Sequence, residues 1–324
     1  MSKVFVVTPF FCTQGNQRLS YLLETLYWVR RQSYRDYLHV VVDDGSTDRS
    51  IEVVEEIAAQ DSRLKVFQKI NGGSSSAINY GVAQALRIAK PGFITICHSD
   101  DVMLPGSLQA RLDTAQRTGS EFVHSDYLLM TEDGVVRRRR AKDMATAAEL
   151  YQRLLSLKKA VLYPTMFWEA DFFLDRIGGF DPEITSAEDW DIALRTAQQL
   201  VVHRSEPATC RAATMLKRNH AGCLRIQNTL DGTKARCYER IFRKHLKGRE
   251  YDRAMAKARQ TRLHPSTSSW RPRHVAKALR QVPGFRSIAS ILRRRTAISL
   301  DRETNAFLYD MREIGAQMRC RRAA

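Results

Sequence analysis

The chain has 324 residues, 44% of them hydrophobic, which is enough for one large α/β core or for one domain with an appendage. No apolar run approaches the roughly 18 residues of a membrane span, and Val4–Val7 is too short for a signal peptide, so we expect a cytoplasmic protein. Its six cysteines are scattered without a CxxC pair, which argues against a zinc cluster or a disulfide framework, and we expect them to be reduced.

The net charge of +17 is distributed unevenly. From Phe242 to Ala324 there are 21 Lys and Arg against 6 Asp and Glu, a net +15, so the first 241 residues carry only +2. Such asymmetry indicates a polyanionic partner, which could be acidic lipid headgroups, nucleic acid or an acidic acceptor. We therefore expect a body at 1–241 and a basic, mainly helical extension at 242–324.

Strand and helix signals alternate from residue 4. Short apolar runs predict strands at 4–8, which Pro9 closes, and at 38–42, 64–67 and 93–97. Apolar residues at helical spacing predict helices at 19–29, 51–58 and 77–86. This βαβα succession predicts an α/β fold with a mostly parallel sheet and right-handed crossovers.

The pattern becomes less regular after Pro105. We expect helices at 108–115, 147–157 and 192–200, a hairpin of 122–130 with 135–136, and a short strand at 165–168. The hairpin is antiparallel, so the whole sheet should be mixed. Beyond Arg240 we expect basic helical segments that are broken by prolines.

The second strand ends at two acids, Asp43 and Asp44. Because the carboxyl ends of strands form the ligand crevice of an open α/β sheet, we expect these acids to face a pocket and not the core. We also expect Ser46 or Thr47 to cap the next helix, with Asp48 in its first turn.

Standard phosphate-binding loops are absent from the sequence. No GxGxxG follows the first strand and no GxxxxGK[ST] occurs anywhere, which excludes both backbone phosphate cradles. Asn71, Gly72 and Gly73 form a turn after the third strand, where a ligand could approach the backbone closely, although an ordinary tight turn explains them equally well.

The fourth strand ends at His98, Ser99, Asp100 and Asp101. Mg²⁺ and Mn²⁺ prefer carboxylate oxygens and combine one or two of them with water and phosphate oxygens, so Asp100 and Asp101 are candidate metal ligands. They could also simply begin the next loop. His98 could be a ligand, a ribose contact or only a strand-end residue.

Residues 178–195 form the third candidate site. Glu188, Asp189 and Asp191 open an amphipathic helix, where the helix dipole alone could account for acids. The dipole also keeps a carboxylate ionised, as a general base requires, and Asp189 is the candidate for that role.

Seven motifs occur in an order that resembles the family 2 inverting glycosyltransferases of the GT-A fold. They are TPFF (8–11), VVVDDGSTD (40–48), NGGSSSAINYG (71–81), HSDDVMLPGSL (98–108), GGFD (178–181), EDWD (188–191) and KRNHAG (217–222). The resemblance covers about residues 1–241 and makes that part the catalytic domain. It implies transfer of a sugar from a nucleotide-diphosphate donor to a glycan or lipid-linked acceptor.

The resemblance also assigns roles to residues. Nucleotide-sugar binding is implied for Thr8, Pro9, Phe10, Asp43, Asp44, Asn71 and Asp100. It implies that Asp100, with Asp101 and His220, holds Mn²⁺ or Mg²⁺ on the diphosphate. Asp189 would deprotonate the acceptor hydroxyl, with Glu188 and Trp190 on the acceptor side. The family commonly has an acid in place of His98 and often a Tyr in place of Phe10, so metal affinity or donor choice could differ.

Two other functions compete with this interpretation. A GT-A-fold nucleotidyltransferase would attack the α-phosphate instead, and a non-catalytic nucleotide- or glycan-binding module would result if His98 had ended metal binding. The extension contains an apolar series among basic residues at 275–295, which suits either an anionic membrane surface, as for a peripheral protein at the inner face of the plasma membrane, or packing on the catalytic domain. We expect no nucleic-acid partner, because aromatic residues are sparse there.

Overall fold

The computed structural model describes residues 3–13, 18–131, 134–158, 161, 163–219 and 232–260, and a nine-stranded mixed sheet forms the centre of this part. The strands are β1 (Val4–Phe10), β2 (Tyr37–Asp43), β3 (Leu64–Gln68), β4 (Phe93–Ile96), β5 (Val102–Met103), β6 (Phe122–Met130), β7 (Val136–Arg139), β8 (Phe167–Glu169) and β9 (Ala208–Arg218). Their order is β3-β2-β1-β4-β8-β6-β9-β5, and β7 pairs with β6.

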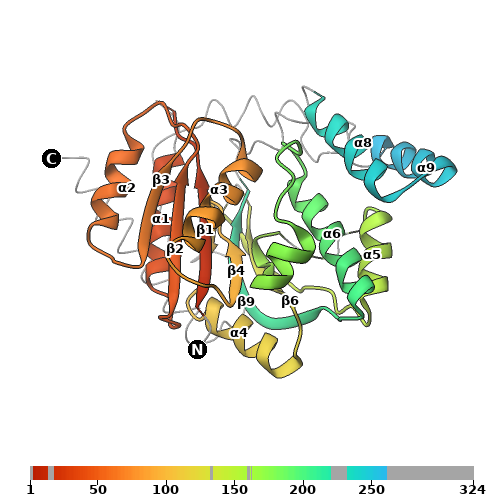
Figure 1. Ribbon diagram of the computed structural model, residues 1–324, viewed down its shortest axis with the longest axis horizontal. Coiled ribbons are helices and arrows are strands. Elements are labelled where there is room, and N and C mark those ends of the chain that lie inside the picture. The colour runs from red at the N-terminus through yellow and green to blue at the C-terminus, as the bar shows by residue number, and fades with distance from the viewer. Residues whose placement is uncertain are drawn as a thin grey trace.

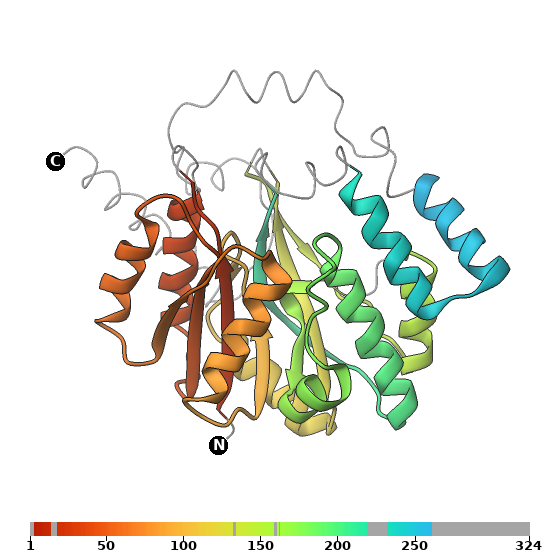
Figure 2. The same cartoon turned by 45° about the horizontal axis from the view of Figure 1, so that its top comes forward.

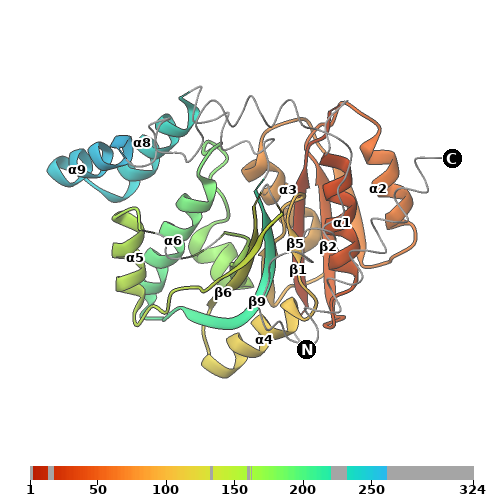
Figure 3. The same cartoon turned by 180° about the vertical axis from the view of Figure 1, so that it is seen from behind.

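Helices cover both faces of this sheet, as the opposite views of Figures 1 and 3 show. They are α1 (Arg18–Arg30), α2 (Ser50–Ala58), α3 (Ser74–Leu86), α4 (Ser107–Thr118), α5 (Ala147–Leu155), α6 (Glu188–His203), α8 (Thr233–His245) and α9 (Gly248–Ala258). A 3₁₀ turn at Tyr163–Thr165 and a π-helical turn at Phe172–Ile177 flank β8.

The first four strands are parallel and are joined through α1, α2 and α3, which confirms the predicted βαβα succession. All seven residues of β1 and of β2 are buried. In β1, Phe5 and Val7 pack with residues of α3, whereas Val4 and Val6 pack on the other face with residues of α1 and α4. Burial on both faces explains why these strands read as continuous apolar runs.

Pro9 does not close β1, which continues to Phe10. Pairing of β1 with β4 ends at Val7 and Ile96, while pairing with β2 continues to Phe10 and Asp43. Val7 O accepts a hydrogen bond from the β4 side and Phe10 O from the β2 side, so Pro9 faces the side where β4 has ended. The N–H group that proline lacks is therefore not needed there.

The second half of the sheet is mixed, as predicted. The hairpin of β6 and β7 is antiparallel, and β8 is antiparallel to both β4 and β6. The sequence analysis did not predict β9, which runs parallel to β6 with two register shifts, at Ser125/Asp126 and Asp126/Tyr127. Figure 3 shows these two long strands side by side.

The predicted cap of α2 is wrong. This helix begins at Ser50, and Arg49 at its N-cap position makes no side-chain hydrogen bond to it. Ser46 Oγ instead accepts a hydrogen bond from the Cys12 N–H group (2.8 Å), and Asp48 Oδ1 accepts one from the Ser50 N–H group (3.1 Å). Ser46 thus ties the turn to the segment after β1.

Helices α8 and α9 lie beside each other at the end of the molecule away from α2 (Figure 2). Helix α8 runs across residue 241, and Phe242 is completely buried in a cluster with Tyr238 and Met255. Residues 242–260 therefore pack on the body, although the domain division at 241 remains a prediction. The apolar series at 275–295 lies outside the described residues. Among the helices that the structure describes, none combines the length and apolar composition of a membrane span.

Candidate active site

The carboxylate of Asp44 joins two motifs at the end of β2. It accepts hydrogen bonds from the backbone N–H groups of Gly72 (3.0 Å) and Gly73 (2.7 Å) and from Lys69 Nζ (2.8 Å). Asn71 Nδ2 donates to the Asp44 carbonyl oxygen (2.8 Å). A carboxylate can accept about four hydrogen bonds, and these three side-chain bonds of Asp44 leave about one position.

Asp43 supports the same turn from inside the sheet. Its Oδ1 accepts from the Ser46 N–H group (2.8 Å) and its Oδ2 from Gln68 Nε2 (2.9 Å). Gly45 has φ +78°, and a Cβ there would lie 2.9 Å from the Asn71 nitrogen, so only glycine fits. Asp43 and Asp44 are both buried and hold the turns after β2 and β3 together; that they face a pocket and contact a nucleotide remains a prediction.

Thr8, Pro9 and Phe10 lie beside these acids, with Phe10 paired to Asp43. Thr8 Oγ1 is hydrogen-bonded to His39 Nε2 (2.9 Å), and burial lowers the pKa of His39 to about 3, so this histidine is neutral. Phe10 packs in an apolar cluster with residues of α1 and α2. The three side chains are buried, and their predicted contacts with the nucleotide base remain predictions.

Asp100 and Asp101 differ in their surroundings. Asp101 is completely buried; its Oδ1 accepts from the Arg218 N–H group (3.0 Å) and its carbonyl oxygen accepts from Thr25 Oγ1 (2.7 Å). Arg218 forms a buried ion pair with Glu24 of α1. Asp101 thus fixes the end of β4 to β9 and α1, whereas Asp100 is partly exposed.

The carboxylate oxygen of Asp100 fits a hard divalent cation that keeps water and binds phosphate oxygens. Within the described residues no group of three or more His, Cys, Asp or Glu side chains could hold a metal by itself, so phosphate oxygens would have to complete the coordination. His220, the third predicted ligand, lies outside the described residues.

Tyr163 lies beside the predicted site residues, and the sequence analysis did not single it out. It is 6% exposed, its ring centroid lies 4.7 Å from that of His98, and in the described structure its hydroxyl group has no hydrogen-bond partner. Burial, and after it the charges of Glu188 and Asp189, raise the pKa of Tyr163 well above 10. Tyr163 therefore stands between the end of β4 and the start of α6.

The start of α6 presents two acids with different environments. Asp189 is exposed, and its Oδ1 accepts from the Trp190 N–H group (2.8 Å). Glu188 is half-buried, and burial, followed by the charge of Asp189, raises its pKa to about 7. Ala187, just before the helix, has φ +62°, a strained conformation for alanine that is typical of functional sites.

Trp190 and Asp191 connect α6 to helices α8 and α9. Trp190 packs on the cluster of α8 and α9 residues, and Asp191 is buried between Arg195 (2.8 Å) and Lys244 (2.7 Å). Asp191 therefore anchors α8 to α6. The acceptor-side roles of Glu188 and Trp190 remain predictions.

Lys217 of β9 links the two halves of the site. Its Nζ lies 3.7 Å from Asp101 Oδ2, and its charge slightly opposes the rise in the pKa of Glu188 that burial causes and adds to the fall in the pKa of His98. Burial is the main reason that the pKa of His98 falls to about 4. Lys217 is the first residue of the KRNHAG motif, so the sequence contained a signal that could have identified it. Because β9 was not predicted, the sequence did not indicate where the Lys217 side chain points.

Asn79 of α3 fixes the loop that leads to α6. Its side chain donates to the Phe180 carbonyl oxygen (2.8 Å) and accepts from the Phe180 N–H group (2.9 Å). Ser75 Oγ donates to the Ile184 carbonyl oxygen (3.0 Å). The helix after the NGG turn thus positions the acids of α6.

Comparisons with known proteins point to one family and one fold. The sequence profile of Glycosyl transferase family 2 matches residues 6–177, just over half of the chain. A glycosyltransferase of Streptococcus pneumoniae, GlyG, is 31% identical over 125 residues, which are 38% of this chain and 38% of GlyG. The putative colanic acid biosynthesis glycosyl transferase WcaA of Escherichia coli is 28% identical over 257 residues, covering 78% of this chain and 85% of WcaA.

Solved structures show the same fold at lower identity. S. aureus TarS 1–349 in complex with UDP-GlcNAc has a TM-score of 0.56 and 18% identity, covering 79% of this chain and 71% of TarS 1–349. The mannosyltransferase PcManGT of Pyrobaculum calidifontis, in complex with GDP-Man and Mn²⁺, has a TM-score of 0.54 and 17% identity, covering 98% and 86%. The predicted GT-A fold is confirmed.

Proposed function

Because the chain belongs to Glycosyl transferase family 2, we propose that it transfers a sugar from a nucleotide-diphosphate donor to a hydroxyl group of a glycan or lipid-linked acceptor, with inversion. The observation that supports the proposal is spatial. The ring of Tyr163 lies 4.7 Å from that of His98 at the end of β4, and the charges of Glu188 and Asp189 at the start of α6 also act on Tyr163, which supports placing both motifs in one site.

The transfer needs one base and no covalent intermediate. In the proposed step the Asp189 carboxylate takes the proton of the acceptor hydroxyl, whose oxygen forms a bond to the anomeric carbon. The bond from that carbon to the phosphate oxygen breaks on the opposite face, and the nucleoside diphosphate leaves. An exposed carboxylate at a helix N-terminus suits this role, and such a base contributes roughly 10² to 10⁴ in rate.

Asp100 would hold Mn²⁺ or Mg²⁺, supported by Asp101 and by His220. A bound divalent cation would neutralise charge on the leaving diphosphate. Lys217 adds a positive charge on the same side of the site, and Asp101 keeps the loop of Asp100 in place through its bond to the Arg218 N–H group.

The donor is supported by the solved neighbours, since the TarS and PcManGT complexes contain UDP-GlcNAc and GDP-Man. The remaining acceptor position of Asp44, beside the NGG turn, suits an N–H group of a nucleotide base. Family membership favours this reaction over nucleotidyl transfer or binding alone. The acceptor class and a place in polysaccharide biosynthesis rest on the likeness to WcaA.

Thermal shift with UDP and GDP, each with and without Mn²⁺, tests the proposal. A ligand at about 100 times its Kd adds roughly 2.7 kcal/mol of stability, so the correct nucleotide should raise the melting temperature measurably. Asp100→Asn should abolish the Mn²⁺-dependent part of this shift.

The matched control is Asp113→Asn, because Asp113 is exposed on α4 and bonded only to the neighbouring Gln109 side chain among the contacts described. The control should behave as the unmodified protein does. An unchanged Mn²⁺-dependent shift in Asp100→Asn would remove Asp100 from the metal site, and no shift with any nucleotide would contradict the proposed donor.

A further inference from the structure

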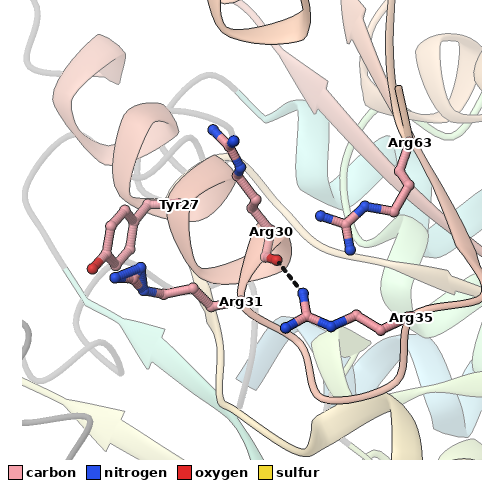
Figure 4. A pocket seen from close by; sticks show the side chains of 5 residues that line it. All are labelled: Tyr27, Arg30, Arg31, Arg35 and Arg63. Carbon is pink, nitrogen blue, oxygen red and sulfur yellow. Dashed lines mark hydrogen bonds between the residues drawn. The ribbon is translucent and has the colours of Figure 1, made fainter. Parts of the chain in front are cut away.

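Four arginines line a pocket of about 520 Å³ near the amino ends of β2 and β3, whereas the candidate active site lies at the carboxyl ends of the strands. Arg30 ends α1 and Arg31 follows it, Arg35 lies in the loop before β2, and Arg63 directly precedes β3. Tyr27 completes the lining (Figure 4). Strand β2 begins beside the pocket and ends at Asp43. Its seven residues rise about 3.3 Å each, so the pocket lies roughly 20 Å from the acids at the carboxyl end of β2.

Positive charge in the pocket exceeds negative charge. Asp61 pairs with Arg63 (2.7 Å) and lies 3.4 Å from Arg30. Arg31 and Arg35 form no ion pair with a carboxylate in the part of the chain that the structure describes. One carboxylate therefore faces four guanidinium groups.

These guanidinium groups are held in position by other contacts. Arg31 stacks on Tyr27, with 4.1 Å from its Cζ to the ring centroid, and Arg63 stacks on Tyr37 at 4.7 Å. Figure 4 shows Arg35 and Arg63 extending toward the end of α1, where Arg35 donates to the Arg30 carbonyl oxygen (3.4 Å). A guanidinium group that is already stacked on a ring loses less conformational freedom on binding two oxygens of a ligand than an unstacked one does.

A purely structural role explains part of the cluster. Arg30 and Arg35 interact favourably with the carbonyl end of α1, where basic residues are stabilising. That role requires neither Arg31 nor the convergence of Arg63 from a different strand. An excess of guanidinium groups is an arrangement that proteins use to bind phosphate.

We propose that this pocket binds a phosphate group, carried either by a soluble molecule or by an acidic lipid headgroup. The site is separate from the donor site at the carboxyl ends of the strands, and it does not depend on the proposed transfer reaction. A phosphate would bring the negative charge that the pocket lacks and would accept hydrogen bonds from the guanidinium groups that line it.

The test compares two variants of the full chain that carry the same net charge. Arg31→Gln with Arg35→Gln changes the pocket, and Arg87→Gln with Arg117→Gln changes two exposed arginines, one directly after α3 and one on α4. Binding of inorganic pyrophosphate is measured by calorimetry in EDTA, which suppresses metal-dependent binding at the donor site. Co-sedimentation with vesicles of equal parts phosphatidylcholine and phosphatidylglycerol measures lipid binding.

The pocket variant should lose about tenfold or more in pyrophosphate affinity, in vesicle binding, or in both, while the control variant stays within about twofold of the unmodified chain. Loss of pyrophosphate binding alone assigns a soluble ligand, and loss of vesicle binding alone assigns a headgroup. Equal losses in the two variants would reduce the effect to net charge and overturn the proposal. Absence of binding in the unmodified chain would overturn it as well. Unchanged melting temperatures confirm that the variants are folded.

Discussion

The rings of Tyr163 and His98 lie 4.7 Å apart, which brings the segment before β8 to the end of β4. Burial lowers the pKa of His98 to about 4 and raises that of Tyr163 above its usual value, so both side chains are neutral near pH 7. Neutral groups with hydrogen-bonding atoms suit sugar hydroxyl groups better than phosphate. The Tyr163 hydroxyl is buried in the described structure, so we expect it to contact the transferred sugar or the acceptor only after a side-chain movement that ligand binding induces.

Tyr163→Phe separates this role from a structural one. A buried hydroxyl group without a partner costs roughly 1–3 kcal/mol, so its removal should leave the melting temperature unchanged or raise it. Transfer should fall by about tenfold, because the variant loses one hydrogen bond to the substrate; a tenfold change corresponds to about 1.4 kcal/mol. Kinetics and thermal melting are measured on the same preparation. Full activity in the variant would make Tyr163 a core residue only.

Glu188 should make stability depend on pH. Because burial raises its pKa from 4.5 to about 7, the unfolded chain ionises this group first, and its contribution to stability is lost as the pH rises through that window. Glu188→Gln cannot ionise. The difference in melting temperature between the variant and the unmodified protein should therefore grow in favour of the variant between pH 4.5 and pH 7.

Melting curves at pH values across this window measure the effect, and Glu56→Gln, an exposed position on α2, is the control. The control should follow the unmodified protein at every pH. A pH-independent difference for Glu188→Gln would mean that the carboxyl group has the same pKa in the folded and the unfolded chain.

The parallel half of the fold could be predicted because each of its strands is a local apolar run that ends at polar residues. Strand β9 could not be predicted in the same way, since Ala208–Arg218 mixes small, polar and basic residues and pairs with the distant β6 through two register shifts. The cap of α2 was predicted wrongly because Ser46 bonds to Cys12, a contact that only the folded chain creates.

The candidate site, like the fold, has features that the sequence indicates and features that it does not. Acids at strand ends and at a helix start are visible in the sequence, and the motif order supplies their roles. Other features of the site depend on contacts between segments that are distant in the sequence, so no local pattern could indicate them. They are the hydrogen bonds of Asn79 to Phe180, the effect of the Lys217 charge on Glu188, and the position of Tyr163.

Truncation tests the basic extension, and the structure determines where to cut. A cut after Arg240 would remove buried Phe242 and the Lys244 bridges to Asp181 and Asp191, so it should unfold α8. A cut after Gln260 removes residues 261–324, which carry a net +10, and leaves those contacts in place.

The shorter chain should keep its nucleotide-induced thermal shift and lose most of its binding to anionic vesicles, at about 1 kcal/mol for each basic residue near the surface. Co-sedimentation at two salt concentrations measures the loss. Vesicle binding that survives the cut would assign the membrane contact to the body, where the arginine pocket lies, and aggregation would favour packing of the extension on the catalytic domain.

Asp189→Asn tests the charge on which the proposed reaction depends. Asn keeps the size of the side chain, and its oxygen can still accept from the Trp190 N–H group, so the start of α6 should remain intact. Transfer should fall by roughly 10² or more while donor affinity changes little, because the base acts on the acceptor alone. Asp191→Asn is the matched control at the same helix turn; it breaks the bridges to Arg195 and Lys244 and should lower the melting temperature instead. If transfer by Asp189→Asn survives nearly intact, Glu188 becomes the candidate base, and if donor binding collapses as well, Asp189 belongs to the nucleotide site and the assigned step is wrong.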